Sequence, residues 1–141
     1  MKINDLAAAL RASATGIYAV EAGVSLLISN GTFLHRDDFT SRFIHHGTSD
    51  GTTMAAIDWD AAIAALAIGN LPCSGGERRI LQLAASLAAG TIISLRDTVT
   101  GIDDANIALF VTAIGHASGK RPQSSGRSLR PPARLPRRYL A

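Results

Sequence analysis

Apolar residues recur three or four positions apart over most of the first 119 residues, which is the spacing of one face of a helix. Val20, Val24 and Leu27 follow this spacing, and Asn30-Gly31 supplies a helix stop. The pattern predicts helices over approximately these ranges: 5–12, 15–30, 37–46, 59–68, 75–89, 95–100 and 104–118. In the last of these helices, the residues expected to form the buried stripe are Ile107, Phe110, Val111 and Ile114.

Helix-capping residues mark several of these boundaries. Ser74 and Glu77 have the spacing of a capping box, in which each side chain binds the backbone N–H of the other residue. Ser94 and Asp97 repeat that spacing. Asp103 directly precedes the last predicted helix and is a good N-cap residue. Because these signals lie between residues 74 and 103, the helix boundaries are predicted more precisely in the second half of the chain than in the first.

The segment between the third and fourth predicted helices is the least regular part. We expect the third helix to end at His45-His46-Gly47, where histidines would match the negative end of the helix dipole. Residues 48–53 are polar and contain glycine, which predicts a loop, and residues 54–57 form a brief strand or an extended link. The resulting fold class is all-α: an irregular or orthogonal bundle of six or seven short helices.

Composition agrees with a helical core, because aromatic residues make up only 5% of the chain while Ala, Leu and Ile are common. Charge divides the chain at Gly119. Residues 1–119 carry seven basic and eleven acidic side chains, a net charge of −4, whereas residues 120–141 carry seven basic side chains and no acidic one. We therefore expect a helical domain, 1–119, followed by a disordered tail, 120–141, which also contains four of the five prolines.

The basic tail is a candidate contact for nucleic acid or another anionic partner, such as a membrane surface or an acidic protein patch. Its positively charged residues are Lys120, Arg121, Arg127, Arg130, Arg134, Arg137 and Arg138. Tyr139 is its single aromatic residue, so base stacking would add little, and binding would be non-specific and dependent on salt. The alternative is a solubilising extension without a partner.

Candidate chemistry elsewhere has simpler structural explanations. Adjacent His45 and His46 would point about 100° apart on a helix and form a poor chelating pair, so no metal site is expected. Cys73 has no neighbouring base in the sequence, which favours a free, partly buried thiol over a nucleophile. Glu21, at the edge of an apolar stripe, is expected to form an ion pair, and Asp58 is expected to cap a helix.

Two further motifs offer only weak support for a function. Ser74-Gly75-Gly76 precedes a helix, a geometry that can hold a phosphate, but the P-loop lysine and the nucleotide fingerprints are missing, so no cofactor is expected. Residues 94–117 have the layout of a helix-turn-helix. The second helix, however, begins with Asp103 and Asp104 and contains no Lys or Arg, which opposes groove reading.

Part of the second half resembles a group of small uncharacterised bacterial helical proteins, over about residues 54–119. The residues that carry the resemblance are Glu77-Arg78-Arg79, Leu83-Ala-Ala-Ser-Leu87, Ser94-Leu-Arg-Asp97, Gly101-Ile-Asp-Asp104-Ala-Asn106 and His116-Ala-Ser-Gly119. They are largely caps and core positions, so the resemblance implies a helical fold and no particular activity.

The sequence as a whole predicts a non-enzymatic interaction or regulatory module with an unidentified protein partner. The alternative is non-specific nucleic-acid association through the tail, and an enzyme site near Cys73, Ser74 and Glu77 is a third hypothesis. No apolar run is long enough to cross a membrane, and we expect a cytoplasmic protein. The sequence predicts no particular oligomeric state.

Overall fold

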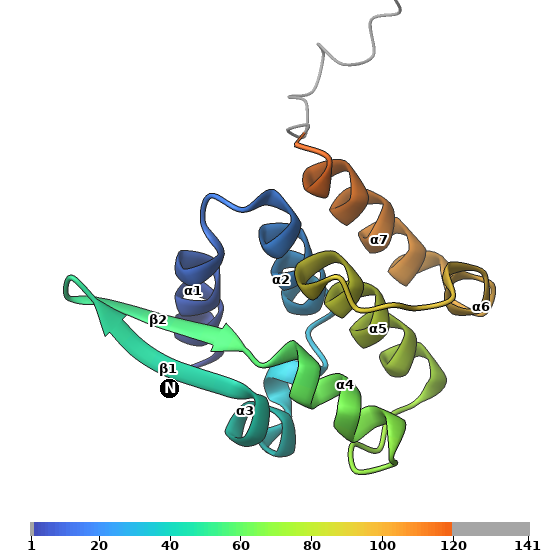
Figure 1. Cartoon of the computed structure of the whole chain (residues 1–141), viewed down its shortest axis with the longest axis horizontal. Helices are drawn as coiled ribbons and strands as arrows, with labels where there is room; N and C mark the ends of the chain where they lie inside the picture. The colour runs from blue at the N-terminus through green and yellow to red at the C-terminus, as the bar shows by residue number, and fades with distance from the viewer. Residues whose placement is uncertain (1, 120–141) are drawn as a thin grey trace, which may run out of the picture.

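The computed structural model describes residues 2–119, and the predicted tail, 120–141, lies outside the described residues. Within this range the chain is mostly helical, with one small sheet (Figure 1). Its elements, in chain order, are α1 (Ile3–Ala14), α2 (Tyr18–Asn30), the 3-10 helix η1 (Phe33–His35), α3 (Asp37–Phe43), β1 (Ile44–Ser49), β2 (Thr52–Ile57), α4 (Trp59–Ala67), α5 (Gly75–Ala89), α6 (Leu95–Val99) and α7 (Asp104–Ala117).

Helix α2 is the central element, and its most extensive contacts are with α5 and α7. Gly23 permits the close approach of α2 to α5. A Cβ atom at this position would lie 2.6 Å from the carbonyl oxygen of Ala84 and 2.7 Å from the Cβ of Ala88. Small residues on both helices therefore set the distance between them, as expected when backbones pack closely.

The core combines aliphatic side chains with a small aromatic cluster. Phe33, Phe39 and Phe43 form a tilted series with ring centroids 5.0 and 5.4 Å apart. The largest fully buried side chains are Phe33, Phe39, Leu10, Leu26, Leu27, Leu71, Ile80, Leu81 and Leu83. They come from both halves of the sequence, so the described residues share one continuous core.

The all-α prediction is wrong in one region, because residues 44–57 form an antiparallel hairpin. The expected helix end and loop over residues 44–53 are β1, the turn and the beginning of β2, whereas the brief strand considered for residues 54–57 is confirmed as part of β2. The turn residues Asp50 and Gly51 both have positive φ values, 51° and 79°, which is the requirement of a tight type I′ hairpin turn. Ile44 pairs with Ile57, and both side chains are buried together with Ala55. Their burial, and the packing of α1 on β2, stabilise a strand pair whose outer half is polar. In Figure 1 the hairpin projects on the side of the molecule opposite α6 and α7.

The hairpin also changes the explanation of His45 and His46. Helix α3 ends at Phe43, so both histidines lie on β1 and cannot interact with a helix dipole in the predicted way. Two smaller features also differ from the prediction. Helix α2 begins at Tyr18 rather than near Thr15, and the link after Gly31 contains η1.

Most predicted caps are confirmed. Asp58 accepts a hydrogen bond from the N–H of Ala61 at 3.1 Å, and Asp103 accepts one from that of Asn106 at 2.8 Å. Both halves of the Ser74–Glu77 capping box are present. These contacts join residues only three positions apart, which explains why the sequence alone was sufficient to predict them.

Candidate functional site

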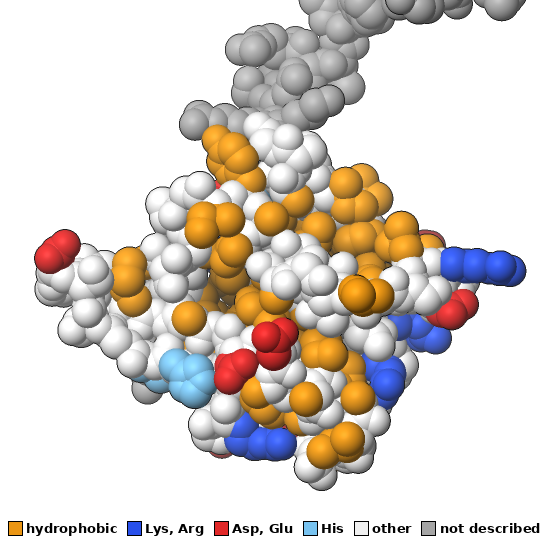
Figure 2. All heavy atoms as spheres, viewed as in Figure 1, with side chains coloured by type: hydrophobic (Ala, Val, Ile, Leu, Met, Phe, Trp, Pro, Cys, Tyr) orange, Lys and Arg blue, Asp and Glu red, His pale blue; other side chains and the backbone are white. Residues whose placement is uncertain are grey.

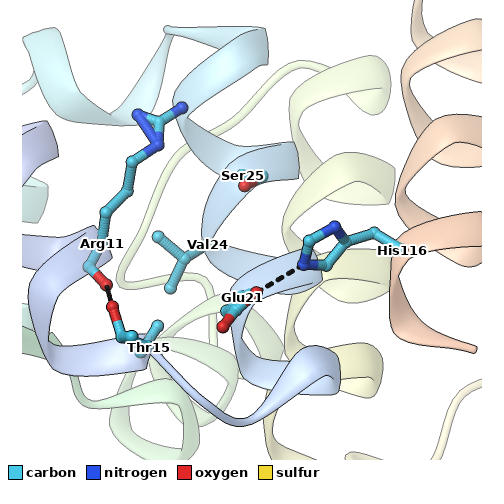
Figure 3. A pocket seen from close by; sticks show the side chains of 7 residues that line it. Arg11, Thr15, Glu21, Val24, Ser25 and His116 are labelled. Atoms are coloured by element: carbon cyan, nitrogen blue, oxygen red, sulfur yellow. Dashed lines mark hydrogen bonds and ion pairs between the residues drawn. The ribbon is translucent and has the colours of Figure 1, made fainter. Parts of the chain in front are cut away.

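The beginning of α2 and the end of α7 are joined by a half-buried pair of ionisable side chains, Glu21 and His116. Glu21 Oε1 lies 2.6 Å from His116 Nε2 (Figure 3). Glu21 Oε2 accepts a hydrogen bond from the N–H of Gly16 at 2.7 Å. The Gly16 amide, followed by His116, lowers the pKa of Glu21 below its usual value. Glu21 therefore has a close ionisable side-chain partner, and the structure identifies this partner as His116.

A cavity of about 280 Å³ lies beside this pair. It is lined by Arg11, Ala14, Thr15, Glu21, Val24, Ser25 and His116. Figure 3 shows the Arg11 guanidinium group directed away from the Glu21 carboxylate. Both carboxylate oxygens of Glu21 already accept hydrogen bonds, which leaves the group poorly placed to act as a base. The Glu21–His116 pair is therefore best explained as a structural contact that joins α2 to α7. We call this contact the clasp.

The second cluster surrounds Cys73, in the link before α5. The Arg36 guanidinium donates to the carbonyl oxygen of Pro72 at 2.7 Å and lies 3.7 Å from the sulfur of Cys73. Arg36 also binds Asp38, with Nε 3.0 Å from Oδ1, and this carboxylate raises the pKa of Arg36. Sequence reasoning missed Arg36 because it is separated from the cluster by more than 35 residues of chain.

The chemistry of this cluster does not support the hypothesis of an enzyme site. Burial raises the pKa of the Cys73 thiol, so the nucleophilic thiolate is disfavoured at neutral pH. Glu77 is already used by the capping box: its Oε1 accepts from the Ser74 N–H at 2.8 Å, and this contact lowers the pKa of Glu77. Arg36 thus holds the link in place by binding the backbone at Pro72.

The histidines and acidic residues do not converge on a metal site within the described range, where no group of three potential ligands occurs. His45 and His46 are exposed on β1, and adjacent strand positions point to opposite faces of a sheet. His45 Nε2 lies 3.6 Å from Asp58 Oδ2, a contact between the hairpin and the N-cap of α4.

The helix-turn-helix interpretation gains no support from the geometry. Helix α6 has only five residues, and α7 begins with the capping residue Asp103 followed by Asp104. Negative charge at this position would repel a phosphate backbone. The seven basic residues predicted to contact nucleic acid, Lys120 to Arg138, lie outside the described residues.

The outer face of α7 is the most unusual surface feature. We define it by Ala108, Val111, Thr112, Ile114 and Gly115. Val111 is 62% exposed and Ile114 is 46% exposed, and no charged side chain occurs between Asp104 and His116. The sequence predicted that Val111 and Ile114 would be buried with Phe110. That prediction is wrong, because α7 turns Phe110 and Ala113 toward the core instead.

Figure 2 shows hydrophobic side chains gathered over α7 and the segment that links α5 to α6. This segment contributes Ile92, which is 96% exposed, and α6 contributes the half-exposed Leu95. Such clusters on a folded surface are typical of interaction sites. Sequence reasoning could have found the signal in the number of apolar residues in α7, which exceeds what one buried stripe requires.

Comparison with protein-family models, curated proteins and solved structures finds no match for this chain. Across residues 2–119, no helix is both long and apolar enough to cross a membrane.

Proposed function

We propose that the protein is a non-enzymatic protein–protein interaction module that binds through the outer face of α7. The observation that carries the proposal is the exposure of Val111 and Ile114 on a helix that has no charged residue between Asp104 and His116. Surface helices of monomeric proteins normally present charged and polar residues to solvent, whereas a helix that is apolar all round is normally covered.

The physical argument concerns the free energy of apolar surface in water. Burial of a side chain such as valine or isoleucine is favourable by about 1.5–3 kcal/mol relative to exposure. In the isolated domain, Val111, Ile114 and Ile92 gain only part of this free energy. Binding of a partner that covers these side chains would provide the rest of the burial free energy, and it would not require a new ion pair.

The test compares the full chain with the variants Val111→Asp and Ile68→Asp. Ile68 is 73% exposed at the end of α4 and is therefore a matched control on another element. We expect proteins recovered with the wild-type chain by affinity purification to be recovered with the Ile68 variant and lost with the Val111 variant. Equal recovery with both variants would contradict a role for α7.

A second function, non-specific association with nucleic acid, is favoured by the charge distribution in the sequence. All seven basic residues of 120–141 occur without an acidic neighbour, while 1–119 has a net charge of −4. We expect duplex DNA binding to fall steeply with salt and to disappear when 120–141 is deleted. Binding retained by the truncated chain would place any contact on the folded domain instead.

A further inference from the structure

We propose that the cavity between the beginning of α5 and the segment that leads into α6 binds a small carboxylate with an apolar body. This inference goes beyond the proposed function, because the cavity and the outer face of α7 are different surfaces. Three observations carry it: two arginines without ion pairs, a guanidinium group held in place between two glycines, and an almost fully exposed isoleucine in the wall of the cavity.

The cavity has a volume of about 440 Å³, which is within the range of small-molecule sites. Helix α5 contributes Arg78, Arg79 and Gln82 to its wall, and the segment before α6 contributes Ile92 and Ile93. Figure 2 shows basic side chains gathered on the side of the molecule where α6 and the beginning of α5 lie in Figure 1. The cavity therefore offers positive charge and apolar surface to the same ligand.

The positive charge of this cavity is not neutralised by the fold. Within residues 2–119, Arg36 is the one arginine that forms ion pairs, so neither Arg78 nor Arg79 has a carboxylate partner. The single acidic residue of the lining, Asp97, is exposed. Two guanidinium groups and one carboxylate give the lining a net charge of +1. A monoanion would balance this charge, whereas a dianion would leave excess negative charge beside Asp97.

Arg79 is held in a defined position by the backbone rather than by an acid. Its Nη1 donates to the carbonyl oxygen of Gly101 at 3.2 Å. A Cβ atom on Gly101 would lie 2.6 Å from the guanidinium carbon of Arg79, and one on Gly75 would lie 3.0 Å from Nη1. The two glycines thus leave room for the group by lacking side chains. A planar guanidinium fixed in this way binds a carboxylate with little further loss of side-chain entropy.

Arg78 and Gln82 supply further donors that the fold does not use. Adjacent helix positions point about 100° apart, so the long side chains of Arg78 and Arg79 reach the same cavity from different directions. Gln82 lies one turn after Arg78 and is half-buried. Among the described residues, the side-chain hydrogen bonds around the cavity include none from Arg78 or Gln82. A carboxylate would give these donors an acceptor.

The apolar part of the ligand is indicated by Ile92 and Ile93, which both line the cavity. Ile93 is packed against the core, whereas Ile92 is 96% exposed. An apolar body placed against Ile92 would remove part of this surface from water, which is favourable. A nucleic-acid strand fits less well, because residues 1–119 carry a net charge of −4 and would repel a polyanion. Charge and apolar surface together favour a carboxylate on an aryl or alkyl body.

The first experiment titrates the full chain with benzoate at constant ionic strength and follows the backbone amide signals by NMR. We expect saturable shifts at Gly75, Gln82 and Ile93. Acetate has the charge without the body and benzyl alcohol has the body without the charge, so each should bind at least about fivefold more weakly. The absence of saturable shifts at these residues with benzoate would overturn the site.

A dianion tests the charge argument. Phenyl phosphate has an aromatic body like that of benzoate and carries two negative charges at about pH 8. We expect it to bind more weakly than benzoate at this pH, because the lining has only one excess positive charge. Tighter binding of phenyl phosphate would overturn the assignment of a carboxylate.

Matched substitutions test the position of the ligand. Arg78→Gln removes an exposed side chain, so the fold should persist while benzoate binding weakens about tenfold. Arg11→Gln removes the same charge from the cavity beside the clasp and should leave benzoate binding unchanged. Ile92→Asn should abolish the preference for benzoate over acetate without weakening acetate binding. Equal losses in Arg78→Gln and Arg11→Gln would reveal a general charge effect and overturn the site. None of these measurements involves a protein partner, so their failure would leave the proposed function unaffected.

Discussion

At the scale of single residues, several polar side chains have hydrogen-bond partners that explain their positions. The clearest case is Glu21, whose two carboxylate oxygens are held by the Gly16 amide and by His116 across 95 residues of sequence. No local pattern could have shown this contact, because its partners approach only after α2 and α7 have packed. The sequence indicated an ion pair for Glu21 but not its partner.

The clasp predicts a pH dependence of stability. The Gly16 amide and His116 hold the pKa of Glu21 below its ordinary value, so its contribution to the free energy of unfolding is fully present above that ordinary pKa and is lost as the pH falls through the folded-state pKa. We expect Glu21→Gln to lower the urea midpoint at pH 7, with a difference from wild type that shrinks in acid. Asp60→Asn, at an exposed carboxylate, should leave the midpoint nearly unchanged. A difference for Glu21→Gln that is constant with pH would contradict the clasp.

At the scale of elements, interactions between near neighbours in the sequence determine the helix caps, whereas contacts between distant residues stabilise the hairpin. The caps at Asp58, Ser74 and Asp103 depend on neighbours three residues away and were predictable. The hairpin was missed although Asp50-Gly51 is a strong turn signal. Its strands lack the regular alternation of apolar and polar residues, since β1 buries only Ile44. Contact with α1 supplies the missing stabilisation.

The hairpin turn can be tested through its glycine. Gly51 has φ of 79°, so alanine at this position should destabilise the fold by roughly 1–2 kcal/mol. Gly47 lies on β1 in open space and without a positive φ, which makes Gly47→Ala the matched control. Chemical denaturation monitored by circular dichroism gives both values. Equal effects of the two substitutions would show that the turn conformation is not responsible.

The packing of α2 on α5 makes a second prediction at this scale. Gly23→Ala places a methyl group 2.6 Å from the Ala84 carbonyl oxygen, so the helices must separate, at a cost of about 1–3 kcal/mol. Gly115→Ala meets open space and should stabilise the fold by up to about 1 kcal/mol. Thermal unfolding at low protein concentration should therefore show shifts of opposite sign. A gain for both variants would mean that α2 and α5 can move apart freely.

At the scale of the whole molecule, the sequence predicted the helical class and the charge division but not the interaction surface. Helix α7 carries apolar residues on more than one side, and spacing alone cannot decide which side meets α2. The packing of α7 against the rest of the fold buries Phe110 and Ala113 and leaves Val111 exposed to solvent. The excess of apolar residues in α7 is visible in the sequence, but which of them face solvent is decided only when the helices pack together.

The charge division makes the last prediction, which concerns a chain ended after Gly119. All core residues of the described range precede this position, so truncation should change the melting temperature by only a few degrees. The net charge changes from +3 to −4, which should abolish retention on a cation-exchange column near neutral pH. Calorimetry and ion-exchange chromatography measure the two effects separately. A large loss of stability would mean that 120–141 contributes to the fold, and the division at Gly119 would then be wrong.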